Sequence, residues 1–151
     1  MPDWLKTLLT IAATLVVAYL SSFWATRKAF QERWWERKER AYSDIVEALH
    51  DLIRFSEICA ADSESGTEDE NPKKKEFRDR YSEAYWKIEK ATDIGAFVIC
   101  DKAAEILANL RDKPKLDCTE NPPWEIYRAN CEHYKIALAK IKECARKDLK
   151  I

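Results

Sequence analysis

Histidine and cysteine are the residues of this chain whose types suit metal binding or nucleophilic chemistry. The histidines are His50 and His133, and the cysteines are Cys59, Cys100, Cys118, Cys131 and Cys144. Cys131 and His133 are two residues apart, so on a helix they point to different sides and do not form a metal site. The number of cysteines is odd and no Cys-x-x-Cys pair occurs, which argues against a disulfide framework.

Motifs of common catalytic sites are missing from the sequence. It contains no Gly-x-Ser-x-Gly elbow, no His-Glu-x-x-His pair and no phosphate-binding Walker loop. Carboxylates are numerous, as expected of a chain in which 35% of the residues are charged. We therefore expect no enzymatic activity, no cofactor and no bound metal. Cys118, in a proline-containing loop, is the thiol that we expect to be most exposed.

The composition predicts that helices position these side chains. Gly66 and Gly95 are the only glycines, and β-hairpins and phosphate-binding loops use glycine heavily. Alanine, leucine, glutamate, lysine and arginine are abundant, which favours an all-α protein. The 26 basic and 27 acidic residues nearly balance. A net charge of −1 gives no attraction to nucleic acid, so we predict no specific nucleic-acid binding.

An uncharged, largely apolar stretch runs from Thr7 to Ala25. A helix needs about 20 such residues to cross the hydrocarbon core of a bilayer. Trp4 and Trp24 bracket the stretch, and tryptophan favours both membrane interfaces. We therefore expect residues 1–26 to form a transmembrane anchor. A cleaved signal peptide fits less well, because there is neither a basic n-region nor a clear cleavage site.

Basic residues flank this stretch unequally, since Lys6 precedes it and a run from Arg27 to Arg40 follows it. The positive-inside rule then places the N-terminus outside and residues 27–151 in the cytoplasm. Reduced cysteines suit that compartment. The expected membrane-interface residues are Trp4, Trp24, Arg27 and Lys28.

Small or hydroxylated side chains recur along one face of the expected anchor, at steps of three, four or seven residues. Such a stripe lets helices approach closely and hydrogen-bond across their interface. We predict a homo-oligomer that associates through this stripe. Ordinary membrane-helix composition is the alternative explanation, and a pore lined by the hydroxyl groups is a further possibility. The members are Thr7, Thr14, Ala18, Ser21 and Ala25.

An antiparallel bundle of about four helices is expected in residues 27–151. The first helix should continue from the anchor without a break, because no glycine or proline occurs between Thr26 and Gly66. Residues 61–71 read as an acidic linker with too few apolar side chains to order itself. The remaining helices are expected over residues 72–94, 101–111 and 124–150.

The last of these helices carries a clear heptad pattern, which predicts a bundle core, with a seam between subunits as the alternative. Its members are Tyr127, Cys131, Tyr134, Leu138, Ile141 and Ala145. Exposed aromatic residues are candidate partner contacts, because tryptophan and tyrosine are frequent hot spots. Burial is the alternative, and we favour it for Trp34. The candidates are Trp34, Trp35, Tyr85, Trp86 and Trp124.

This layout resembles small bacterial inner-membrane proteins that have one N-terminal span and a charged, helical cytosolic domain. Some of those proteins are membrane effectors in anti-phage defence. The resemblance implies an effector that self-associates and perturbs or permeabilises the lipid bilayer under control of its cytosolic bundle. The alternative is a membrane-tethered adaptor whose bundle recruits a cytosolic protein partner.

Overall fold

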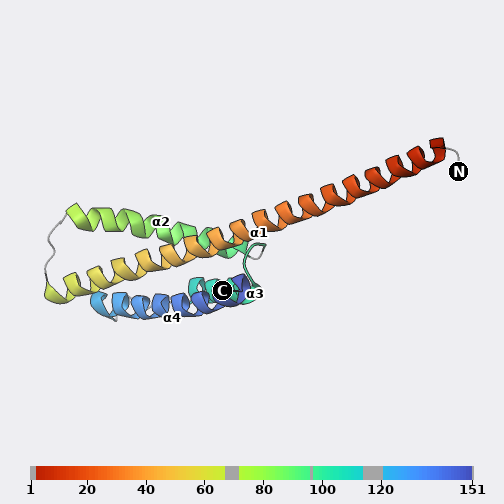
Figure 1. The fold of residues 1–151 in the computed structure, drawn as a ribbon. Helices are drawn as coiled ribbons and strands as arrows, with labels where there is room; N and C mark the ends of the chain where they lie inside the picture. Colours follow the sequence, from red (N-terminus) through yellow and green to blue (C-terminus); the bar gives the residue numbers. More distant parts are fainter. Residues whose placement is uncertain (1–2, 67–71, 96, 114–120, 151) are drawn as a thin grey trace. The chain divides into compact units, whose positions relative to one another are not determined.

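The computed structural model describes residues 3–66, 72–95, 97–113 and 121–150, and within these ranges the only regular elements are helices. The all-α prediction and the number of helices are therefore confirmed (Figure 1). Helices α2, α3 and α4 begin and end within one residue of their expected bounds. The four helices are α1 (Asp3–Ser65), α2 (Pro72–Gly95), α3 (Asp101–Arg111) and α4 (Pro123–Leu149).

Proline and glycine set the ends of the helices, as their backbone preferences require. Pro72 and Pro123 stand at first helical positions, where proline is pre-organised and its missing N–H costs nothing. Gly66 follows the last residue of α1 with a φ of 67°, a conformation that suits glycine. At α3 the N-cap residue is Cys100, so Asp101 lies in the first turn and does not cap it.

The chain divides into two units, Met1–Arg37 and Lys38–Ile151. In the first unit, every described side chain of α1 from Ile11 to Arg37 is exposed. In the second unit, α1 from Lys38 onward joins α2, α3 and α4 in a helical bundle. The boundary between the two units thus lies within α1.

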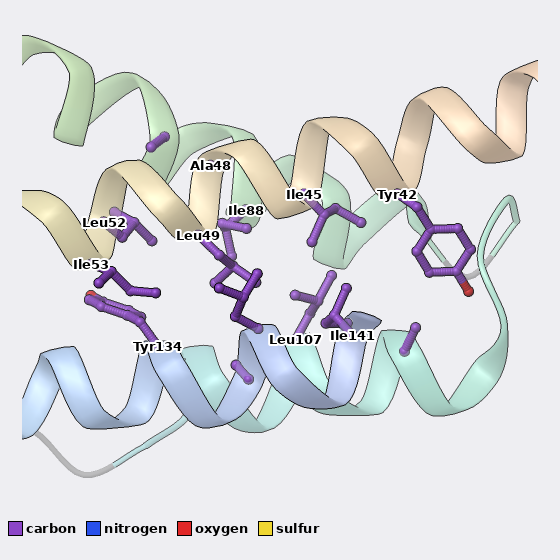
Figure 2. Packing of buried hydrophobic residues seen from close by; sticks show 14 of the residues in the cluster. Tyr42, Ile45, Ala48, Leu49, Leu52, Ile53, Ile88, Leu107, Tyr134 and Ile141 are labelled. Atoms are coloured by element: carbon purple, nitrogen blue, oxygen red, sulfur yellow. The ribbon is translucent and has the colours of Figure 1, made fainter. Parts of the chain in front are cut away.

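Among the described residues, the buried hydrophobic side chains belong to the second unit, and each of its helices contributes to one core (Figure 2). The heptad of α4 supplies one face of this core, as predicted for a bundle within one chain. On α3 the fully buried positions are Ala103 and Leu107, one turn apart. The core residues of α1 are Tyr42, Ile45, Ala48, Leu49, Leu52, Ile53 and Cys59, and those of α4 are Cys131, Tyr134, Ala137, Leu138, Ile141 and Cys144.

Within the described residues, no helix combines the length and the apolarity that a membrane crossing requires. The predicted transmembrane helix is therefore not supported. The predicted location is wrong, namely a bacterial inner membrane with the N-terminus outside and the C-terminal domain in the cytoplasm. The membrane-interface role of Trp4, Trp24, Arg27 and Lys28 is not tested and stays a prediction.

The acidic segment at residues 61–71 is not a linker over its whole length, because α1 includes its first five residues. No glycine or proline occurs within α1, so nothing in its sequence ends the helix before Gly66. The Oγ atom of Ser65 donates to the carbonyl oxygen of Ala61 at 2.9 Å, and Glu64 pairs with Arg128 of α4 at 3.1 Å. Residues 67–71 lie outside the described ranges.

Candidate functional site

A long run of exposed apolar side chains is the most unusual surface of the chain. We call residues 11–35 of α1 the apolar segment. Monomeric proteins rarely expose large contiguous apolar patches, and such patches mark interaction sites. The exposed large side chains of the segment are Ile11, Leu15, Val16, Val17, Tyr19, Leu20, Phe23, Trp24, Phe30, Trp34 and Trp35.

Two stripes run along opposite faces of this segment. The large stripe carries bulky side chains at helical steps of three, four or seven residues. The small stripe is offset from it by two residues, which is about 200° around a helix. The predicted members Thr14, Ala18, Ser21 and Ala25 therefore share one face, while the side chain of Thr7 lies outside the described part. The large stripe consists of Val16, Leu20, Phe23, Phe30 and Trp34.

The hydroxyl groups of the small stripe bond within their own helix. Oγ1 of Thr14 donates to the carbonyl oxygen of Ile11 at 3.2 Å, and Oγ of Ser21 donates to that of Val17 at 2.8 Å. A neighbouring helix would have to compete with these bonds for the hydroxyl protons. The small stripe therefore allows a neighbouring helix to approach closely more readily than it forms new hydrogen bonds with that helix.

The predicted partner-contact aromatics lie on three different helices. Trp34 and Trp35 are 42% and 40% exposed, so the core packing that we favoured for Trp34 is wrong, because the core of α1 begins only at Tyr42. On α2, Tyr85 and Trp86 form an edge-to-face pair with centroids 6.2 Å apart, and Trp86 is 68% exposed. Trp124 is half-buried beneath the guanidinium of Arg128, 5.4 Å from the ring centroid.

The bundle also contains a cavity that the sequence pattern did not reveal, with a volume of about 370 Å³. All four helices contribute side chains to its wall. Its apolar lining comprises Leu52, Ile88, Leu110 and Ile126. Its aromatic and polar lining comprises Tyr81, Tyr85, Tyr134, Glu89, Arg111, Lys113 and Asn130.

Burial and local hydrogen bonds shift the pKa values of groups around this cavity. Burial raises the pKa of Tyr134, whose hydroxyl lies 3.5 Å from that of Tyr81. A hydrogen bond to Glu89 raises the pKa of Tyr85. Burial lowers the pKa of Lys113, since desolvation disfavours its charged form. The amine of Lys113 is thus partly removed from water.

A second polar cluster ties three parts of the bundle together. The Tyr42 hydroxyl donates to Oδ2 of Asp148 at 2.9 Å and accepts from the backbone N–H of Cys100 at 3.2 Å. Lys38 forms an ion pair with the same carboxylate, with Nζ 2.6 Å from Oδ1. The cluster thus joins α1, the N-cap of α3 and the end of α4. The positions of these residues along the sequence follow no pattern that predicts their contact.

The histidines and cysteines do not assemble into a reactive site. Sγ of Cys131 donates to Oε1 of Glu57 at 3.8 Å, and His133 is exposed with Nδ1 2.6 Å from the carbonyl oxygen of Ala129. His50 is exposed as well, and Cys118 lies outside the described ranges. No three metal-ligating side chains cluster anywhere in the part of the chain that the structure describes.

Comparisons with known proteins add no relative. No protein-family model, no characterised protein and no solved structure matches the chain significantly. Any functional assignment therefore stands on the residues themselves.

Proposed function

We propose that this chain is a non-enzymatic helical interaction protein that self-associates through its apolar segment and recruits a protein partner through its bundle. The exposed apolar segment carries this proposal. Its bulky side chains face water in the single chain, although each gains roughly 1.5–3 kcal/mol on full burial. The bundle, in contrast, already has a closed core and no unsatisfied buried polar side chain among its described residues.

A second copy of the chain is the occupant that suits the segment best. The large stripe, taken with Arg27, follows steps of 4, 3, 4, 3 and 4 from Val16 to Trp34, which is the spacing of a coiled-coil seam. A single polar residue within such a seam fixes the register of the helices, and Arg27 occupies such a position. The segment is also apolar on both faces between Ile11 and Ala25, so one helical neighbour would leave part of it uncovered. We therefore propose an assembly of more than two copies that buries both stripes.

Placing a charge on either stripe is expected to disrupt this assembly. Leu20→Glu on the large stripe and Ala18→Glu on the small stripe should each weaken self-association at least roughly 100-fold, because a buried, unpaired charge costs about 3–5 kcal/mol. Sedimentation equilibrium of the full-length chain across a micromolar concentration range measures the effect.

Ala139→Glu is the matched control for Ala18→Glu, because it makes the same change at an exposed position of α4, outside the apolar segment. It should leave the mass distribution unchanged. A wild-type chain that stays monomeric over the whole range would rule out self-association. If the Ala18→Glu and Ala139→Glu variants associated equally well, the interface would be limited to the large stripe.

The bundle offers an aromatic contact for the partner at Tyr85 and Trp86. A photoreactive residue placed at Lys90 would crosslink the bound partner. Trp86→Ala should reduce the yield of this crosslink at least about tenfold, because tryptophans at the centre of an interface commonly contribute about 2 kcal/mol or more to binding. Self-association should be unaffected, because Trp86 lies in the second unit. If the Trp86→Ala variant crosslinked the partner as strongly as the wild type, Trp86 would not be part of the contact surface.

A further inference from the structure

The cavity of the bundle contains a cation that has no ionic partner within the described residues. Nζ of Lys113 lies 2.5 Å from Oδ1 of Asn130 and 5.3 Å from the centroid of the Tyr134 ring. Both contacts are to neutral groups. A half-buried ammonium without a carboxylate is costly, so an anion that entered the cavity would find a partly desolvated partner there.

The other charged groups of the cavity are already engaged. The guanidinium of Arg111 pairs with Asp93 at 3.1 Å and with Asp112 at 3.2 Å. The carboxylate of Glu89 accepts a hydrogen bond from the hydroxyl of Tyr85. Donors that remain in the wall include the protons of Lys113 and the amide NH₂ of Asn130, because Asn130 uses its oxygen to accept from Lys113. Two adjacent donors match the two oxygens of a single carboxylate.

The remaining wall of the cavity is suited to an aliphatic body. Leu52 and Ile88, labelled in Figure 2, belong to the core, and Leu110 and Ile126 extend this lining. Tyr134 already presents its ring to the ammonium of Lys113, so that contact is not available for stacking an aromatic ligand. A volume of about 370 Å³ is within the range of small-molecule sites.

We propose that this cavity binds a medium-chain aliphatic carboxylate, with its head group on Lys113 and Asn130 and its chain along Leu52, Ile88 and Ile126. Apolar burial of the chain supplies most of the affinity, and the ammonium selects for the acid. This site is separate from the self-association of the apolar segment, since all of its residues belong to the second unit.

Titration calorimetry of the full-length chain with decanoate and with decan-1-ol, below their aggregation concentrations, tests the proposal. Decanoate should bind the wild type saturably and at least about tenfold more tightly than the alcohol, since hydrogen bonds to charged groups contribute about 1.5–3 kcal/mol. Lys113→Gln should weaken decanoate binding at least about tenfold and abolish its advantage over the alcohol. Lys75→Gln, at an exposed lysine of α2, is the matched control and should change neither affinity.

A second measurement uses the wild type alone, which keeps the proposal testable if the Lys113 variant does not fold. Decanoate should slow acetylation of Lys113 by acetic anhydride several-fold, as followed by mass spectrometry, and should leave Lys75 unprotected. Absence of saturable binding, equal affinity of wild type and Lys113→Gln, or equal acetylation with and without decanoate would each overturn the site.

Discussion

Replacing Ile141 with alanine is expected to lower the free energy of unfolding of the bundle by about 3 kcal/mol, within the 2–5 kcal/mol range typical of buried isoleucine. Ile141 is 0% exposed and lies in the core between α1, α3 and α4 (Figure 2). Truncation removes apolar contacts and leaves a cavity that its neighbours fill only in part. Urea denaturation followed by circular dichroism at 222 nm measures the loss.

The same substitution at Ile136 is the matched control. Ile136 stands on the same helix but is 53% exposed, so Ile136→Ala should change the free energy of unfolding by less than about 0.5 kcal/mol. Comparable losses at the two positions would contradict the assignment of the core face of α4.

Tyr42→Phe is expected to destabilise the bundle by about 2 kcal/mol. The substitution keeps the buried ring but removes the hydroxyl that accepts from the backbone N–H of Cys100 and donates to Asp148. A buried donor that loses its partner costs about 1–3 kcal/mol, which exceeds the net worth of an ordinary hydrogen bond. The same denaturation experiment measures the effect.

Tyr85→Phe provides the comparison for this second change. The Tyr85 hydroxyl bonds to Glu89 from a ring that is 40% exposed, so water replaces the lost partner. Tyr85→Phe should therefore lower the free energy of unfolding by less than about 0.5 kcal/mol. If Tyr42→Phe proved equally mild, the cluster of Tyr42, Asp148 and Lys38 would have no stabilising role.

Periodicity and helix-end chemistry were sufficient to predict most of the fold. The heptad of α4 became a core face, and α2 ends at Gly95 and begins at Pro72. These features depend on local backbone preferences and on the 3.6-residue period, both of which a single sequence displays. The acidic composition of residues 61–71 predicts a linker, but α1 continues to Ser65 because no glycine or proline interrupts the chain between Arg27 and Gly66.

The sites were far less predictable, for a physical reason in each case. The uncharged run at residues 7–25 was read as a membrane anchor, which the described residues do not support. Trp34 fits the apolar period of α1, yet the period does not tell at which turn the core begins. The cavity around Lys113 brings together residues 17 positions apart, and the cluster at Tyr42 brings together residues as many as 110 positions apart. Such encounters depend on how helices pack, which no local pattern encodes.

Thiols lie buried on the first and the last helix of the bundle, Cys59 on α1 and Cys131 and Cys144 on α4. Burial raises the pKa of Cys131 and of Cys144, so each reacts slowly while its helix is packed. Alkylation must then wait for a local opening event, and its rate reports how often that part of the bundle opens. The alkylation rates of Cys59, Cys131 and Cys144 therefore report how often α1 and two separate turns of α4 open in the native chain, without any introduced label.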